Sequence, residues 1–197
     1  MIQTVAVLFC VLAIWLVVAV YVAARLGLGF RQAILYAPLR VAYRIDDRLI
    51  KAARKAESPV IYIVLHQSRL DPALMLSLLP AETLHILDRE SAQSMWLEPW
   101  RELARTIEFN AHHVFVSRRL VRHLRGKGRL AVYMPDDVEP DAKAFRLYRA
   151  VSRIAAKADA KIVPVFVGGS RHSWLSLSPP DMTSRKLLPK LSITALT

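Results

Sequence analysis

A histidine and an aspartate five residues apart are the side chains of this sequence best suited to chemistry. His66 follows the apolar run 60–65, and Asp71 completes the pattern His-x-x-x-x-Asp. In an α/β protein, ligands bind in the loops at the carboxyl ends of the strands. A carboxylate that holds one ring nitrogen of a histidine leaves the other nitrogen to take a proton from a hydroxyl. The pair is therefore a candidate general base with its orienting partner.

A purely structural role for the same two residues is the alternative. Aspartate is a common N-cap and proline a common first helical residue, so Asp71 could simply cap a helix that begins at Pro72. With six His and nine Asp in 197 residues, chance alone predicts about 0.3 matches to this spacing. The choice therefore depends on the elements around the pair.

The chain after residue 57 predicts an α/β domain. Strands are expected at residues 60–65, 83–87, 114–116, 130–134, 162–167 and 191–196. Helices are expected at residues 73–79, 91–106, 120–125 and 142–158. Strands separated by helices predict a mixed, mostly parallel sheet flanked by helices on both faces. In such a sheet, residue 66 falls at the carboxyl end of a strand.

The N-terminal residues 1–26 predict a transmembrane anchor. Residues 2–24 hold no charged side chain, and a run of about 20 apolar residues crosses the ~30 Å hydrocarbon core as a helix. The alternative is a cleaved signal peptide, but a basic segment before the apolar run is missing and the run is longer than signal peptides use. A retained single-pass helix is the better interpretation.

Charge predicts the orientation of this anchor and a second membrane contact. Basic residues follow the span closely, starting with Arg25 and Arg31, which places the domain on the cytoplasmic side. In residues 27–56, apolar residues at helical spacing alternate with arginine and lysine. We expect amphipathic basic helices there that lie in the headgroup layer. The alternative is that their apolar face packs against the domain 57–197.

The overall charge favours lipid over nucleic acid as the partner. The chain has 28 basic and 16 acidic residues, a net charge of +12. Zinc-ligand spacing, aromatic-rich RNA-binding strands and a helix-turn-helix pattern are missing from the sequence, so we expect no nucleic acid partner. A basic domain tethered to a bilayer binds anionic phospholipid. The single cysteine, Cys10, excludes an internal disulfide.

The order of these motifs resembles the glycerolipid acyltransferase family over about residues 57–196. An anchor is followed by a strand ending in His-x-x-x-x-Asp, a strand ending in proline and a carboxylate, and a strand reading Ile-Val-Pro-Val. The segments 168–174 and 184–193 are most similar to the acyltransferase region of the bacterial 2-acylglycerophosphoethanolamine acyltransferase/acyl-carrier-protein synthetase group.

The resemblance implies a membrane-bound O-acyltransferase of phospholipid biosynthesis in the bacterial inner membrane. Such an enzyme moves a fatty acyl group from an acyl-carrier protein or coenzyme A thioester to a lysophospholipid or glycerophosphate hydroxyl, with neither cofactor nor metal. It implies His66 as the general base and Asp71 as its orienting partner. The substrate-binding residues that the family blocks imply are Ser68, Arg69, Arg118, Asp136 and Pro164.

The third block departs from the family pattern. The family commonly reads Phe-Pro-Glu-Gly-Thr-Arg, whereas this chain reads Met134-Pro135-Asp136-Asp137-Val138-Glu139. A glycine and a basic residue are replaced by acids, which disfavours an ordinary phosphate site. Two alternatives stay open: a degenerate relative that binds lipid or a partner without turnover, and a hydrolase in which His66 activates water. A serine hydrolase is disfavoured because the sequence has no Gly-x-Ser-x-Gly elbow.

Overall fold

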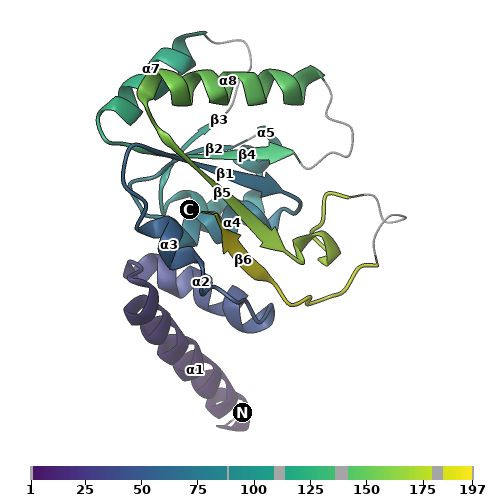
Figure 1. Cartoon of the computed structure of the whole chain (residues 1–197). Coiled ribbons are helices and arrows are strands. Elements are labelled where there is room, and N and C mark those ends of the chain that lie inside the picture. The colour runs from purple at the N-terminus through teal and green to yellow at the C-terminus, as the bar shows by residue number, and fades with distance from the viewer. Residues whose placement is uncertain (1, 88, 109–113, 136–141, 179–183, 197) are drawn as a thin grey trace.

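The protein is an α/β domain that carries a pair of N-terminal helices, and Figure 1 shows a central sheet with helices on both faces. The structure is a computed structural model, and it describes residues 2–87, 89–108, 114–135, 142–178 and 184–196. It confirms the predicted class, a mixed, mostly parallel sheet flanked by helices, together with a long apolar helix at the N-terminus.

The sheet has six strands in the order β3-β2-β4-β1-β5-β6. Their bounds are β1 Val60–His66, β2 Leu84–Leu87, β3 Arg105–Glu108, β4 Arg129–Pro135, β5 Lys161–Gly168 and β6 Ser192–Ala195. All neighbouring pairs are parallel except β5 and β6, which are antiparallel. The carboxyl ends of β1, β4 and β5 therefore lie at the same edge of the sheet.

Alternating side chains of β1 feed two separate apolar cores. Tyr62 and Val64 pack with α4 (Leu70–Leu78) on one face, in the larger core. Ile61 and Ile63 pack on the other face, against α7 (Val114–Arg125) and α8 (Ala142–Ala158). Because both faces are covered, the strand reads as a continuous apolar run rather than an alternating one.

The N-terminal helices α1 (Ile2–Leu26) and α2 (Phe30–Ala42) pack against each other on the α4 side of the sheet. Among the described residues, α1 is the one helix long and apolar enough to cross a membrane. Most of its side chains are exposed, and only its last third reaches the core, through Ala19, Val22 and Leu26. Apolar surface of this kind is costly to leave in water.

The stretch 27–56, predicted to form amphipathic basic helices, contains two helices. It forms α2 and α3 (Ile50–Arg54), separated by a turn in which Arg44 has φ 46°. In the same turn, Asp46 forms a β-bridge to Ser192, the first residue of β6. The apolar face of α2 packs on the domain, where the amide of Gln32 donates hydrogen bonds to the carbonyl oxygens of Leu76 and Leu79.

The expected strand at residues 114–116 is wrong, because these residues form the first turn of α7. The strand in this part of the chain is β3, whose first two residues fall in the range 91–106 that was predicted to be helical. The rest of that range is divided among α5 (Arg89–Gln93), the 3-10 turn Met95–Leu97 and α6 (Glu98–Arg101). Three apolar residues carry no periodicity that separates a strand from a helical turn.

Candidate active site

The candidate site lies where the central strand β1 ends. His66 is the last residue of β1 and is in register with Pro135, the last residue of β4. On the other side, β5 continues beyond its last residue paired with β1, Val165, as far as Gly168. His66 therefore lies at the carboxyl edge of the sheet, level with the end of β4 and beside the longer β5, and its side chain is half-buried.

The carboxylate of Asp71 is held inside the turn that follows His66. It is fully buried, and its Oδ2 accepts hydrogen bonds from the backbone N–H groups of Gln67, at 2.7 Å, and Ser68, at 2.8 Å. The Gln67 N–H belongs to the peptide bond made by His66 itself. A carboxylate with two such donors has a fixed position and does not swing into solvent.

These contacts rule out the simple N-cap interpretation of Asp71. The helix α4 begins at Leu70, and Asp71 lies inside its first turn. An N-cap side chain would accept hydrogen bonds from later N–H groups of its own helix, whereas Asp71 binds N–H groups that precede the helix. Its side chain shapes the turn that carries His66 and does not terminate the helix.

The amino end of α4 has few donors left for a ligand. The N–H groups of Leu70 and Asp71 donate to the side-chain and main-chain oxygens of Ser68, and Pro72 has no N–H. A negative charge that develops near this helix end would therefore be stabilised mainly by the helix dipole.

Two residues that sequence reasoning did not single out lie behind His66. The ring of Tyr133, on β4, packs edge-on against the His66 imidazole, with centroids 5.9 Å apart and planes at 68°. A hydrogen bond of 2.9 Å joins the Tyr133 hydroxyl to Nδ1 of His85, on β2. A polar aromatic residue two positions before the strand-ending Pro135 was the signal available, but only the strand order brings these rings together.

Burial keeps both of these rings uncharged. Full burial lowers the pKa of His85 from 6.5 to about 3, because the imidazolium form is poorly solvated there. The pKa of Tyr133 is raised well above 10.0, first by burial and then by the negative charge of Asp71. Tyr133 and His85 are thus uncharged side chains next to the candidate base.

Ser68, predicted to bind substrate, connects the turn to the C-terminal part of the chain. It is fully buried, and its hydroxyl contacts the Ser173 hydroxyl and the Leu175 carbonyl oxygen, both at 2.9 Å. Two backbone hydrogen bonds reinforce this attachment, from the N–H of Arg69 to Leu175 and from the N–H of Leu177 to Gln67. The segment after β5 therefore holds the His66 turn in place.

The other predicted substrate-binding residues are spread over the domain. Arg69 is exposed beside the turn and forms an ion pair with Glu90 at 2.5 Å. Arg118 is exposed on the second turn of α7, and Pro164 is in the middle of β5, in register with Ile63. Asp136 lies outside the described residues. Of the members of this set that the structure describes, Ser68 and Arg69 lie on the His66 turn, whereas Arg118 and Pro164 do not.

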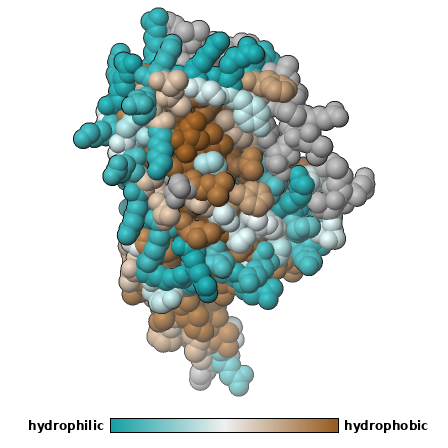
Figure 2. All heavy atoms as spheres, in the orientation of Figure 1, coloured by the Kyte–Doolittle hydropathy of each residue, from teal (hydrophilic) through white to brown (hydrophobic). Residues whose placement is uncertain are grey.

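An apolar surface leads along β5 toward the His66 edge of the sheet. Ile162, Pro164 and Phe166 share the sheet face that α7 and α8 cover elsewhere, yet all three are exposed. Ile63 and Leu65 of the adjacent β1 lie half-buried on the same face. Figure 2 shows apolar side chains gathered on this side of the domain, ringed by polar ones. The surface matches a long apolar ligand better than a polar one.

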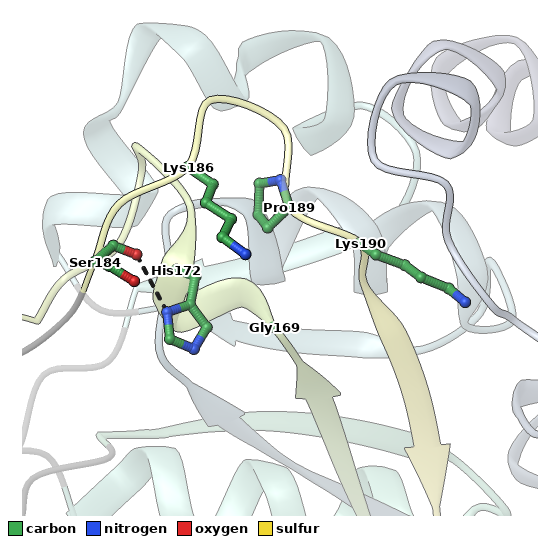
Figure 3. A pocket seen from close by; sticks show the side chains of 6 residues that line it. All are labelled: Gly169, His172, Ser184, Lys186, Pro189 and Lys190. Atoms are coloured by element: carbon green, nitrogen blue, oxygen red, sulfur yellow. Dashed lines mark hydrogen bonds between the residues drawn. The ribbon is translucent and has the colours of Figure 1, made fainter.

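A small hollow of about 220 Å³ lies beyond the end of β5. Figure 3 shows its lining residues, among which Nδ1 of His172 lies 3.3 Å from the carbonyl oxygen of Ser184. The ammonium group of Lys186 points into it, whereas that of Lys190 points away. The residues that the structure describes contain no cluster of three or more metal-ligating side chains.

Comparison with known proteins adds two findings. Residues 44–168 match the family model described as Acyltransferase. The fold is similar to the crystal structure of the 1-acyl-sn-glycerophosphate (LPA) acyltransferase, PlsC, from Thermotoga maritima, with a TM-score of 0.53 and 15% identity. That match covers 95% of this chain and 80% of the other. At this identity the likeness establishes the fold alone, whereas the family match includes the whole of β1 and the His66 turn.

Proposed function

Since this chain belongs to the Acyltransferase family, we propose that it is a membrane-bound glycerolipid O-acyltransferase. It moves a fatty acyl group from an acyl-carrier protein or coenzyme A thioester to a hydroxyl of a lysophospholipid or glycerophosphate. The observation that carries this proposal is the position of Asp71, fully buried and hydrogen-bonded to the two N–H groups that follow His66. A carboxylate fixed there suits the orientation of an imidazole base.

The chemistry requires one base and no nucleophile from the protein. His66 takes the proton from the acceptor hydroxyl as the hydroxyl oxygen attacks the thioester carbonyl carbon. The C–S bond then breaks, the new ester forms, and the thiolate takes the proton back from the imidazolium. Asp71 orients the ring and stabilises its charged form, and the Tyr133 ring limits its rotation.

The exposed apolar residues of β5 are the surface we assign to the acyl chain. Ile162, Pro164 and Phe166 lie on one sheet face, and Phe166 is two residues before the end of the strand. Burying an alkyl chain contributes about 0.8 kcal/mol per CH₂ group. Such a surface favours a long-chain donor over an acetyl donor.

The acceptor we favour carries a positively charged headgroup. In place of the glycine and the basic residue of the family pattern, this chain has Asp137 and Glu139. Acids repel a phosphate monoester but attract an ammonium group. Together with the resemblance to 2-acylglycerophosphoethanolamine acyltransferases, this favours lysophosphatidylethanolamine over lysophosphatidic acid.

The proposed location is the bacterial inner membrane, with α1 as a single-pass anchor and the domain in the cytoplasm. The exposed apolar side chains of α1 support insertion, and Arg25 at its carboxyl end supports the orientation. The net charge of +12 suits an anionic membrane surface and also an acidic acyl-carrier protein.

The test is an acyl-transfer assay with the purified, detergent-solubilised chain. Radiolabelled acyl-carrier protein or acyl-coenzyme A is incubated with lysophosphatidylethanolamine, lysophosphatidylglycerol, lysophosphatidic acid and glycerol phosphate in parallel. Water as acceptor is scored in the same reactions as released fatty acid. We expect esterification, with lysophosphatidylethanolamine preferred.

Two variants decide what the assay means. His66→Ala should lose at least about a hundredfold in rate, the usual contribution of a general base. The matched control is His123→Gln, a histidine on α7 at the other end of the sheet, which should retain activity. Absence of transfer to every acceptor, from folded and vesicle-bound protein, would refute the enzyme and support the non-catalytic lipid-binding alternative. Release of fatty acid alone would support the hydrolase.

A further inference from the structure

The segment that fastens the His66 turn also exposes an unusual amount of apolar surface. We define the C-terminal loop as residues 170–178 and 184–190. Four of its large apolar side chains are exposed: Trp174 at 62%, Leu177 at 44%, Leu187 at 70% and Leu188 at 45%. Single exposed apolar residues are common, but four on one loop mark a binding surface.

The most exposed of these residues are brought together by the backbone. Ser173 and Lys186 form an isolated bridge, and the N–H of Lys186 donates to the His172 carbonyl oxygen at 2.8 Å. Trp174 and Leu187 follow the two bridged residues directly. The indole and the leucine therefore come from adjacent backbone positions, although they are 13 residues apart in sequence.

The same loop also exposes basic side chains. Arg185, Lys186 and Lys190 are exposed. The sequence from 169 to 191 contains four arginines and lysines and a single acid, Asp181. Tryptophan and leucine interleaved with basic residues are the composition of segments that rest in the headgroup layer of an anionic bilayer.

The loop returns to the sheet beside the N-terminal helices. The N–H of Leu191 donates to the carbonyl oxygen of Tyr43, the residue after α2, and the N–H of Asp46 donates to that of Leu191. Figure 1 shows this arm of the loop passing the carboxyl end of α2. Nearby along the chain, Val41 and Leu49 are also exposed, at 58% and 52%. The loop thus lies next to the part of the molecule that carries the apolar helix α1.

We propose that the C-terminal loop is a second bilayer contact, which inserts Trp174, Leu187 and Leu188 among anionic lipid headgroups while its basic residues bind phosphates. An acidic carrier protein would suit the basic residues but would leave the exposed indole and leucines without a purpose. The loop is fastened to the His66 turn through Ser68 and Ser173. Bilayer contact would therefore bring the catalytic edge of the sheet down to the lipid surface, independently of which acyl group is transferred.

The test places a fluorescent label on a single cysteine introduced into the loop. Cys10→Ser removes the native cysteine and gives a background in which Leu187→Cys carries an environment-sensitive fluorophore. The matched control is Ser152→Cys, an exposed residue of α8 on the opposite face of the sheet. Both proteins keep α1 and are reconstituted in vesicles of phosphatidylglycerol and phosphatidylcholine, with or without bromine atoms near the top of the acyl chains.

We expect the emission maximum of the label at residue 187 to shift to the blue when vesicles are present, and its intensity to fall strongly when they are brominated. The label at residue 152 should show neither change. Leu188→Cys is a second reporter in case Leu187→Cys folds poorly. Equal emission from the labels at 187 and 152 in brominated vesicles would overturn the proposal. So would a label at 187 that responds only to added acyl-carrier protein, which would assign the loop to a protein partner. The readout does not involve turnover, so it stands or falls separately from the acyltransferase assignment.

Discussion

The ring of Tyr133 meets the imidazole of His66 edge to face, with centroids 5.9 Å apart, and its hydroxyl is tied to His85 at 2.9 Å. These residues come from three strands, β4, β1 and β2. Since Asp71 is fixed by the backbone of the turn, the base is confined by a carboxylate in the turn and an aromatic ring on the neighbouring strand. Substitution of Tyr133 or of Asp71 removes one of these two constraints on His66 at a time.

Tyr133→Leu should lower kcat and leave KM for the acceptor nearly unchanged. An aromatic pair contributes about 0.5 to 1.5 kcal/mol, which corresponds to roughly a two- to tenfold loss in rate. Tyr133→Phe keeps the ring edge and should recover most of the activity. A loss of stability without any change in kcat for the folded Leu variant would show that Tyr133 is structural only.

Asp71→Asn should abolish most of the transfer while the turn persists. The amide oxygen still accepts hydrogen bonds from Gln67 and Ser68, but the neutral side chain no longer stabilises an imidazolium. We expect a loss of about a hundredfold or more in kcat, with a small change in the thermal midpoint. Wild-type turnover in this variant would remove Asp71 from the mechanism and leave it as a turn residue.

Much of the fold followed from the sequence because its signals are local. The predicted bounds agree with the structure within a few residues for the apolar strand ahead of His66 (β1), the helix 142–158 (α8) and the uncharged N-terminal run (α1). The elements between residues 91 and 116 were not, because short apolar runs there fit a strand and a helical turn equally well.

The parts of the site that were missed depend on contacts distant in sequence. His85 and Tyr133 are 48 residues apart and meet only because β4 inserts between β2 and β1. The contacts of the buried Ser68 with Ser173 and Leu175 could not be predicted either, because nothing in the local sequence reveals them. Strand order and the path of a returning loop cannot be read from spacing along the chain.

The buried His85 should make stability depend on pH. Its pKa is about 3 in the folded protein, against 6.5 for an unperturbed histidine. Between these values the unfolded chain binds a proton that the folded chain does not, so stability falls as pH falls. The slope from this group approaches roughly 1.4 kcal/mol per pH unit. Denaturant midpoints measured in detergent between pH 7 and about pH 5 would test it.

The matched comparison for this pH effect is between two histidines. His85→Gln removes the titrating group and should flatten the dependence, whereas His172→Gln, at an exposed site, should leave it in place. An unchanged slope in His85→Gln would mean that His85 is already charged in the folded state or that another group is responsible.

Asp47 should be the residue whose loss separates the N-terminal helices from the domain. It is 1% exposed, and its carboxylate contacts Arg25 of α1 at 3.2 Å, Arg40 of α2 at 3.0 Å and the Tyr36 hydroxyl at 2.9 Å. The pKa of Tyr36 is raised, first by burial of its hydroxyl and then by the negative charge of Asp47. Asp47→Asn leaves two guanidinium groups without a counter-charge, and breaking a buried pair in this way costs about 3 kcal/mol or more.

The neighbouring Asp46 provides the control for that change. Its side chain is 47% exposed and pairs with the exposed Arg48, so Asp46→Asn should cost less than about 1 kcal/mol. Denaturant unfolding and limited proteolysis of the two variants in detergent would measure the difference. We expect faster cleavage between α2 and β1 in Asp47→Asn alone, because the Arg25 and Arg40 contacts are what join both helices to residues 43–49. Equal protection in the two variants would instead assign the attachment of α1 and α2 to apolar packing through Ala19, Val22 and Leu26.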